Sequence, residues 1–338
     1  MRPLLEVRDL QVHFPVGGGL FRKPDRFVQA VNGVSLALAP GEVVAVVGES
    51  GCGKTTLARA VMGLAAPSAG SILFRGENLA LHAAKAQRAY RRHVQMVFQD
   101  PFDSLNPRKT VFQTLAQPLR IHGIVPAREL RREAVRLLDL VGLSPGAQYL
   151  DRFPHQFSGG QRQRICIARA LAVRPSIIVA DEAVSALDIS IRAQILTLMK
   201  RLQAELGLAY LFITHDLGVV RSLCDRVLVM YLGQVVEEGP TEAIFDAPRH
   251  PYTAALLGSC PVPDPVAARA RSAVPLAGDV PSPLDPPPGC RFHTRCPEVR
   301  DACRAVPPPP VAFGGQTAHC HRARELRLAP LAVQEGLT

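Results

Sequence analysis

The stretch VVAVVGESGCGKTT, residues 43–56, decides the fold of this 338-residue chain. Its first five residues are apolar, which is typical of a strand that is buried on both faces, as in a parallel sheet. A glycine-rich turn follows at once, and a helical pattern begins near Thr55. The order of strand, glycine turn and helix places a helix N-terminus at the carboxyl end of a buried strand.

Residues 48–55 fit the pattern G-x-x-x-x-G-K-[ST], known as the P-loop. Its glycines let backbone N–H groups turn towards a β-phosphate, and the helix N-terminus adds positive charge. Lys54 would contact the β- and γ-phosphates, and the Thr55 hydroxyl would ligate Mg²⁺. A bare glycine turn is the alternative. The nucleotide-binding residues that we expect are Gly48, Glu49, Ser50, Gly51, Cys52, Gly53, Lys54, Thr55 and Thr56.

A second apolar strand, Ile177 to Ala180, runs into two carboxylates, Asp181 and Glu182. Unpaired charges at the end of a buried strand would be costly, and Mg²⁺ would offset that cost. Asp181 would hold the ion through its water shell, and Glu182 would polarise an attacking water as general base. A structural pair of surface acids is the alternative interpretation.

Further strands and helices alternate along the chain. Leu4 to Phe14 has the alternation of an edge strand and leads into the turn Gly17 to Gly19. Buried strands are predicted at Val94 to Phe98, Tyr210 to Thr214 and Val227 to Tyr231. One helical face is formed by Leu130, Ala134, Leu137, Leu138 and Val141 before Gly142, and another by Ile191, Ile195, Leu198, Leu202 and Leu206 before Gly207. This alternation predicts a doubly wound α/β core.

Two regions depart from that alternation. Residues 104–172 have no strong strand pattern, which indicates a helical insertion in the core. After Cys260 many prolines keep the backbone extended, which predicts a linker and a small C-terminal module poor in core residues. We therefore divide the chain into a domain at residues 1–258 and an extension at residues 259–338.

Composition excludes several classes of protein. With 47% hydrophobic and 20% charged residues the chain can bury a core. It lacks both an apolar run long enough to cross a bilayer and a signal-peptide core, so we expect any membrane role to be peripheral. The net charge of +10 comes mostly from dispersed arginines, which favours solvated faces over a nucleic-acid partner. Eight cysteines without a secretory signal argue against a disulfide framework.

A further motif narrows the choice among P-loop proteins. The run Ser158, Gly159, Gly160 and Gln161 resembles the signature of ABC transporter ATPases and precedes a helical run through Arg169. Ser158 is a natural N-cap, and the two glycines would let a phosphate approach the helix end. The resemblance implies a P-loop NTPase ABC cassette, with a RecA-like core, an antiparallel β edge and a helical subdomain. It also implies that two chains enclose two ATP molecules, each signature facing the partner's P-loop.

Other residues match the remaining motifs of this family in order. Gln99 matches the Q-loop glutamine, which senses Mg²⁺ and water, and His215 matches the switch histidine at the γ-phosphate. Taken alone, His215 would be read as a packed or surface histidine. Phe14 is our candidate for stacking on adenine, with Phe27 as the alternative. The D-loop, which touches the opposite subunit, is matched by Ser185, Ala186, Leu187 and Asp188.

Three segments resemble the oligopeptide and dipeptide permease subgroup, in its second, F-like type of ATPase subunit. They are residues 99–101 (QDP), 104–108 (SLNPR) and 250–253 (HPYT). This resemblance implies peptides as substrate, two transmembrane permease subunits, a homologous second ATPase subunit and an extracytoplasmic substrate-binding protein. It places the chain at the cytoplasmic face of a bacterial membrane. Two residues depart from the family pattern: Ala183 replaces a proline, and Phe157 replaces a leucine.

The interpretation leaves other functions open. Close relatives of the subgroup import nickel or glutathione, and a cytosolic ATPase does not itself recognise the cargo. A soluble ABC ATPase that acts on nucleic acid or ribosomes usually has two cassettes or long coiled-coil insertions, and this chain has neither. A non-catalytic regulatory subunit is disfavoured because Lys54, Asp181, Glu182 and His215 are all present.

Four cysteines gather near the end of the chain, at Cys290, Cys296, Cys303 and Cys320. Four thiolates in a small module could hold a [4Fe–4S] cluster or tetrahedral Zn²⁺, and unliganded thiols are the third option. The paired C-x₂₋₄-C knuckles of structural zinc sites are absent, and the surrounding sequence resembles the extension of peptide-importer ATPases that carry a cluster. His293, His319 and His321 could substitute as ligands. Of the other cysteines, we expect Cys52 to be open to alkylation and Cys166 and Cys224 to lie in the core.

Overall fold

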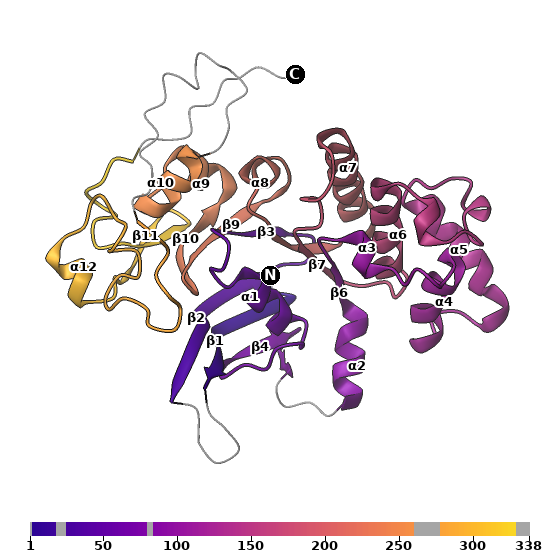
Figure 1. Cartoon of the computed structure of the whole chain (residues 1–338), viewed down its shortest axis with the longest axis horizontal. Coiled ribbons are helices and arrows are strands. Elements are labelled where there is room, and N and C mark those ends of the chain that lie inside the picture. Colours follow the sequence, from indigo (N-terminus) through magenta and orange to yellow (C-terminus); the bar gives the residue numbers. More distant parts are fainter. Residues whose placement is uncertain (1, 18–24, 80–83, 260–277, 329–338) are drawn as a thin grey trace.

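The computed structural model describes residues 2–17, 25–79, 84–259 and 278–328 (Figure 1). Gly18 and Gly19 of the expected turn, and most of the expected proline linker, lie outside the described residues. Helices α4 (Val111–Ile121) and α5 (Leu130–Leu140) form one end of the molecule, and α12 (Asp301–Ala305) lies at the other. The sheets that carry the predicted phosphate site lie between these two ends.

An eight-stranded sheet forms the core, in the order β11-β12-β10-β9-β3-β8-β7-β6. Its five parallel strands are β9 (Arg226–Tyr231), β3 (Val43–Val47), β8 (Ala209–Ile213), β7 (Ile177–Asp181) and β6 (Val94–Val97). Every residue of β3, β7 and β8 is buried, as the apolar runs predict. The doubly wound α/β core is therefore confirmed.

Alternate residues of these strands face two separate hydrophobic cores. On β3, Val43, Ala45 and Val47 face one core, which includes residues of α4, α5 and α6 (Gly159–Leu171). Val44 and Val46 face a second core, which α1 (Lys54–Val61) shares with strands β1 (Leu5–Val16) and β2 (Arg26–Leu38). Both faces of the sheet are thus sealed from water, and each fully buried aliphatic side chain contributes about 1.5–3 kcal/mol.

A separate antiparallel sheet has the order β2-β1-β4-β5. Strand β1 (Leu5–Val16) lies where a strand was predicted, but the prediction of an edge strand is wrong, because β1 pairs with β2 on one side and with β4 on the other. Strand β2 (Arg26–Leu38) pairs with it through most of its length, while β4 (Ala69–Phe74) and β5 (Glu77–Asn78) complete the sheet. The sequence patterns did not predict these last three strands.

The helical insertion is confirmed as well. Throughout the fully described stretch 98–176, between β6 and β7, the regular elements are all helices. They are α3 (Pro101–Ser104), α4, η2 (Ala127–Glu129), α5, η3 (Gly146–Gln148), η4 (Pro154–Gln156) and α6 (Gly159–Leu171). Leu130, Ala134, Leu137, Leu138 and Val141 are all buried, as their spacing predicts.

The larger domain also contains α2 (Ala84–His93), α7 (Ile189–Leu206), α8 (Leu217–Leu223) and α9 (Thr241–Asp246). Helix α7 ends at Gly207, which has a left-handed backbone, as predicted. The prediction for Leu206 is wrong, because that side chain is 47% exposed at the frayed last turn of the helix. In the part of the chain that the structure describes, no helix is long and apolar enough to span a bilayer.

The C-terminal residues continue the main sheet. Strand β10 (Gln234–Pro240) pairs with β9 on one side and with β12 (Gln316–His319) on the other, and β11 (Pro310–Phe313) forms the edge. Phe292 is 1% exposed and belongs to the first core. The described residues 278–328 are poor in core residues, as expected: their buried apolar side chains are Phe292, Cys303, Ala318 and Ala323, and Phe292 packs into the core of the larger domain.

A buried carboxylate joins three parts of the chain at this junction. Glu237 on β10 is fully buried and accepts hydrogen bonds from the backbone N–H groups of Arg249 and His250, just before α10 (Pro251–Gly258). It also accepts one from Gln316 Nε2 on β12, at 2.6 Å. Burial raises the pKa of Glu237, and these donors oppose the rise.

We predict that Glu237→Leu destabilises the folded chain by about 3 kcal/mol, because three buried donors lose their acceptor. Urea denaturation followed by circular dichroism measures the change. Glu242→Leu, on the exposed side of α9, is the matched control and should alter stability little. Equal stability of the two variants would contradict the role given to Glu237.

Candidate nucleotide site

The glycine-rich loop begins directly after β3 and ends at the first residue of α1. Gly53 precedes that helix with φ 105°, and a Cβ atom there would lie 2.0 Å from the carbonyl oxygen of Ala30 on β2. Only glycine fits this position, because the backbone conformation and the close approach both exclude a side chain. The antiparallel sheet therefore packs directly against the glycine-rich loop.

Lys54 lies inside the loop. Its Nζ atom donates hydrogen bonds to the carbonyl oxygens of Gly48 and Glu49, each at 2.8 Å, and the side chain is buried. A buried ammonium on the floor of a glycine loop, next to a helix N-terminus, attracts an anion. This is the environment that a phosphate group requires.

Thr55 and Asp181 lie close together at the carboxyl edge of the main sheet. The Thr55 hydroxyl donates to Asp181 Oδ1 at 3.4 Å, which joins the start of α1 to the carboxyl end of β7. Burial raises the pKa of Asp181, and the neighbouring charge of Glu182 raises it further. The anionic form of Asp181 would therefore be favoured by a nearby cation, and a hydroxyl beside a carboxylate is an oxygen donor set that suits Mg²⁺.

Glu182 is the first residue after β7, which ends at Asp181. Its backbone has φ 49°, a conformation that is rare for residues with side chains. The Glu182 N–H donates to the Ile213 carbonyl oxygen at 2.9 Å, and Glu182 Oε1 lies 3.2 Å from His215 Nδ1. Strained backbone of this kind is found at functional sites, where the surroundings hold it in place.

Gln163 was not predicted from the sequence, although it contacts the same turn. It is fully buried on α6, and its Nε2 atom donates to the carbonyl oxygen of Ala183 at 2.6 Å. The helix that begins at the signature is thereby fastened to the residue after Glu182. A buried polar residue on a helix face that is otherwise apolar was the signal that could have revealed it.

The signature run begins α6 as predicted. Ser158 is its N-cap, and the side chains and backbone of Ser158 and Gln161 form a reciprocal capping box. Gly160 is required for packing, because a Cβ atom there would lie 2.5 Å from Ile191 Cγ2 on α7. Ser158 is exposed, so its face of the helix end is open to a ligand or a partner.

The D-loop candidates follow Glu182 without a break. Ser185 Oγ donates to the Glu182 carbonyl oxygen at 2.9 Å, and Asp188 precedes α7. Ala186 is exposed and Leu187 is buried. Ile189, the first residue of α7, has 83% of its surface exposed. This loop therefore presents an apolar residue to solvent beside the catalytic candidates.

The other candidates are less tightly placed. Gln99 is exposed just beyond β6, so it shares the carboxyl edge of the sheet with Asp181. Phe14 and Phe27 lie on the paired strands β1 and β2, and each is 44% exposed. Exposure leaves both rings accessible to a base, and the choice between them stays a prediction.

Cysteines inside the cassette are inaccessible. Cys166 and Cys224 are buried in the core, as expected. Cys52 is also buried, at 2% exposure, and burial raises its pKa. The expectation that Cys52 is readily alkylated is therefore wrong, because the thiolate form is both disfavoured and shielded.

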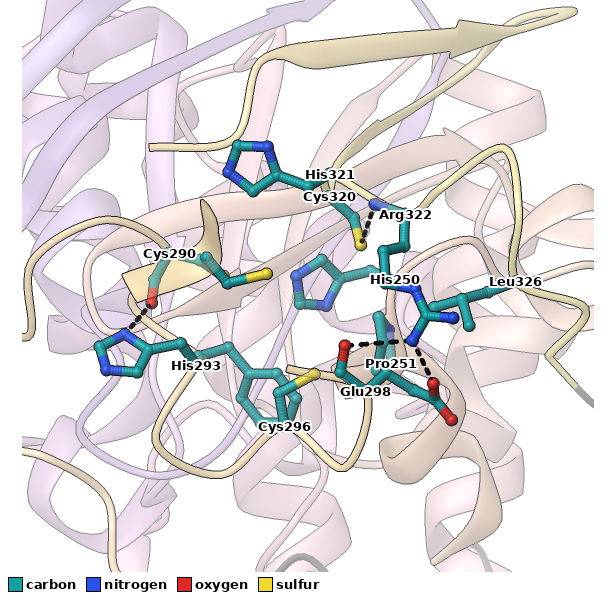
Figure 2. Close-up of a pocket in the computed structure, with 12 residues that line it drawn as sticks. His250, Pro251, Cys290, His293, Cys296, Glu298, Cys320, His321, Arg322 and Leu326 are labelled. Atoms are coloured by element: carbon teal, nitrogen blue, oxygen red, sulfur yellow. Dashed lines mark hydrogen bonds and ion pairs between the residues drawn. The ribbon is translucent and has the colours of Figure 1, made fainter. Parts of the chain in front are cut away.

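The four C-terminal cysteines line one small cavity, together with His250, His293 and His321. Figure 2 shows the sulfur atoms of Cys290, Cys296 and Cys320 directed towards a common space. All four are free thiols, and burial raises the pKa of Cys290 to about 11 and that of Cys296 to about 12. Within the described ranges, no three His, Cys, Asp or Glu side chains are arranged as ligands of a single metal ion.

Comparison with known proteins agrees with this arrangement. Residues 31–185 match the family model described as "ABC transporter", and residues 236–303 match "Oligopeptide/dipeptide transporter, C-terminal region". The chain is 51% identical over 319 residues to a probable peptide ABC transporter ATP-binding protein of Sinorhizobium fredii, covering 94% of this chain and 89% of the relative. It is 48% identical to the dipeptide transport ATP-binding protein DppF of Escherichia coli, covering 94% of both chains.

A solved structure has the same fold. The dimeric cassette MJ0796, in a post-hydrolysis state bound to ADP and Pi, aligns with a TM-score of 0.61 and 29% identity, over 70% of this chain and 98% of that one. The relatives extend over nearly the whole chain, including the C-terminal region. The chain therefore belongs to the family of ABC transporter ATP-binding proteins that carry the oligopeptide/dipeptide transporter C-terminal region.

Proposed function

We propose that this chain is the ATP-hydrolysing subunit of an importer for dipeptides or oligopeptides, bound to the cytoplasmic face of a bacterial membrane. One arrangement carries the ATPase assignment. The Thr55 hydroxyl bonds Asp181, and the Glu182 carboxylate contacts His215, beside the glycine-rich loop that holds Lys54. The names of the relatives support peptides as cargo. We further propose a cassette at residues 1–258 and an extension at residues 259–338.

In this proposal Lys54 and the loop N–H groups bind the β- and γ-phosphates of ATP, and Phe14 stacks on the adenine. Thr55 and Asp181 would hold Mg²⁺, with Gln99 as a further ligand; the ion would neutralise charge on the phosphates. Glu182 orients water and accepts its proton, while His215 contacts the γ-phosphate and, through its 3.2 Å contact, fixes the Glu182 carboxylate.

The second half of each site would come from another cassette. Ser158 to Gln161 are capped and face outward, so they can approach a nucleotide that is bound to a partner. Ile189, 83% exposed beside the D-loop, would be covered in such a dimer. The dimeric state described for MJ0796 supports this assembly. We propose a homologous ATPase as partner, in keeping with the resemblance of the chain to the second type of ATPase subunit in peptide importers.

A cleft on the helical insertion suits the membrane partner. Its volume is about 960 Å³, and Phe102, Ile121 and Arg169 lie in its wall. Phe102 is 62% exposed and lies close after Gln99, so a segment seated there would sense changes at the γ-phosphate end of the site. We propose that the two permease subunits dock here, and that an extracytoplasmic binding protein delivers the peptide to them.

The cysteine cavity offers the donor set of a cluster. Four thiols from three separate segments line it, its volume is small, about 10 Å³, and the thiols would have to draw together around an occupant. We propose that Cys290, Cys296, Cys303 and Cys320 hold a [4Fe–4S] cluster with a structural role, and Zn²⁺ is the alternative occupant. The cluster would tie Cys290 and Cys296 to the segments around α12 and β12.

We predict that Glu182→Gln lowers ATP turnover by roughly 10²-fold or more, because the amide cannot accept the proton from water. The same variant should form an ATP-stabilised dimer, which size-exclusion chromatography with light scattering would detect. Glu205→Gln, which alters an exposed carboxylate on α7, is the matched control and should retain turnover. Unchanged hydrolysis in Glu182→Gln would remove this residue from the role of general base.

Affinity purification from membranes should recover two permease proteins, a second ATPase and a binding protein whose ligand is a short peptide. Phe102→Asp should lose the permease proteins, because a carboxylate replaces the exposed aromatic ring that the cleft offers for docking. Phe153→Asp, at an exposed phenylalanine outside the lining of that cleft, is the control. A binding protein loaded with nickel or glutathione would contradict peptide import while leaving the ATPase assignment intact.

Anaerobically purified protein should absorb broadly at about 400 nm and contain stoichiometric iron. Cys296→Ser should lose both signals, since one of four ligands is removed, whereas Cys166→Ser in the cassette core should keep them. Metal analysis and absorbance spectroscopy provide the measurements. Colourless protein that carries only zinc would contradict the cluster, and protein without either metal would contradict both occupants.

A further inference from the structure

Glu49, the second residue of the glycine-rich loop, is held at three points. Its N–H donates to Tyr252 Oη at 2.9 Å, and its carbonyl oxygen accepts from Lys54 Nζ at 2.8 Å. Its carboxylate accepts two parallel hydrogen bonds from Arg295, at 2.6 and 3.1 Å. Two of these three partners lie more than two hundred residues away along the chain. The conformation of Glu49 is therefore set by the C-terminal half of the protein.

Arg295 is almost completely buried, with 7% of its side chain exposed. The hydrogen bonds to Glu49 raise the pKa of Arg295, so the guanidinium keeps its charge. A bidentate pair of this type fixes both direction and distance, unlike a single contact between two point charges. The geometry suits an arginine whose purpose is to orient one carboxylate.

The segment that carries Arg295 is itself rigidly docked. Phe292 packs edge-on against Tyr231 and in a tilted contact against Tyr252, with ring centroids 5.2 and 5.3 Å apart. Arg291 donates to the Leu232 carbonyl oxygen and to Gln29 Oε1. Cys290 and Cys296 bracket the segment and line the cavity of Figure 2. The packing of this segment therefore holds Arg295 beside the glycine-rich loop.

The charge of Glu49 matters because of where it lies. The residue lines a cleft of about 570 Å³ that His215 and Gly48 also line, and 27% of its side chain is exposed. A free carboxylate at this place would repel the polyphosphate of a nucleotide, and it could also turn inward to bind Lys54. The two hydrogen bonds from the Arg295 guanidinium neutralise the Glu49 carboxylate and hold it away from Lys54.

We propose that Arg295 is a positioning residue for the phosphate loop, so that the C-terminal extension sets the affinity of the cassette for ATP. The proposal rests on the nucleotide-binding function proposed above. It assigns to the extension a part in the nucleotide site of its own chain. Arg295 acts through Glu49 and does not itself touch the nucleotide.

The test measures binding of the non-hydrolysable analogue AMP-PNP, with Mg²⁺, to the full chain by calorimetry. Arg295→Met should raise Kd about tenfold, because an unpaired carboxylate then faces the phosphates. The double variant Arg295→Met, Glu49→Gln should recover most of that loss, since the repelling charge is gone. A purely structural role for Arg295 predicts no recovery, because the second substitution restores no packing.

Two controls separate the proposal from general damage. Arg291→Met removes a buried arginine of the same segment that does not contact Glu49, and Arg300→Met removes an exposed arginine paired with Glu325. Circular dichroism and thermal melting check that each variant is folded. Glu49→Gln should improve binding only in the Arg295→Met background and not in the Arg291→Met background.

The outcomes are distinguishable. Unchanged Kd in Arg295→Met, or failure of Glu49→Gln to recover binding, overturns the proposal for Arg295. Absence of AMP-PNP binding in the unaltered chain, or binding that survives Lys54→Ala, overturns the proposed function instead. If Arg295→Met does not fold, Glu49→Gln and the charge swap Glu49→Arg, Arg295→Glu test the pair: the swap should bind more tightly than Glu49→Arg alone.

Discussion

Burial of both faces of the short parallel strands is the constraint from which the remaining structure follows. Strands β3, β7 and β8 are five residues each, and all their side chains are buried, with Asp181 the most exposed at 8%. Charged groups therefore occur only where these strands end. At those ends lie the glycine-rich loop after β3, Asp181 as the last residue of β7, and His215 shortly after β8. The polar residues of the site lie together because charged groups are excluded from the interior of the sheet.

The same constraint explains what the sequence could predict. An apolar run followed by a glycine turn or by paired carboxylates is a local pattern, and for β3, β7 and β8 it located the strands to within a residue or two. The predicted helical faces of α5 proved correct for the same reason. Local patterns do not record contacts between distant segments. The pairing of β10 with β12, and that of Arg295 with Glu49, depend on residues far apart in the chain and could not be foreseen.

Ala183 shows how a departure from the family pattern can be accommodated. A proline there would restrict the backbone of Glu182 directly. In this chain Glu182 has φ 49°, and hydrogen bonds hold the turn on both sides: Ile213 accepts from the Glu182 N–H, and Gln163 donates to the Ala183 carbonyl oxygen. Buried hydrogen bonds with no water to compete can fix a strained turn without a proline ring. The turn is also tied to the signature helix, so a partner that displaces α6 would displace Glu182.

The need to bury apolar side chains also shapes the C-terminal extension, at the end of the main sheet formed by β12 and β11. Residues 278–328 are too few to bury a core of their own. They add β12 and β11 to the main sheet and pack Phe292 against both Tyr231 and Tyr252, whose rings also contact each other. The Tyr252 hydroxyl accepts a hydrogen bond from the Glu49 N–H, and the Arg295 guanidinium donates to the Glu49 carboxylate. A small module that borrows its core from the cassette cannot shift without disturbing the residues it packs against. Its attachment to the second residue of the glycine-rich loop, through Arg295 and Glu49, therefore ties the position of that loop residue to the docking of the extension.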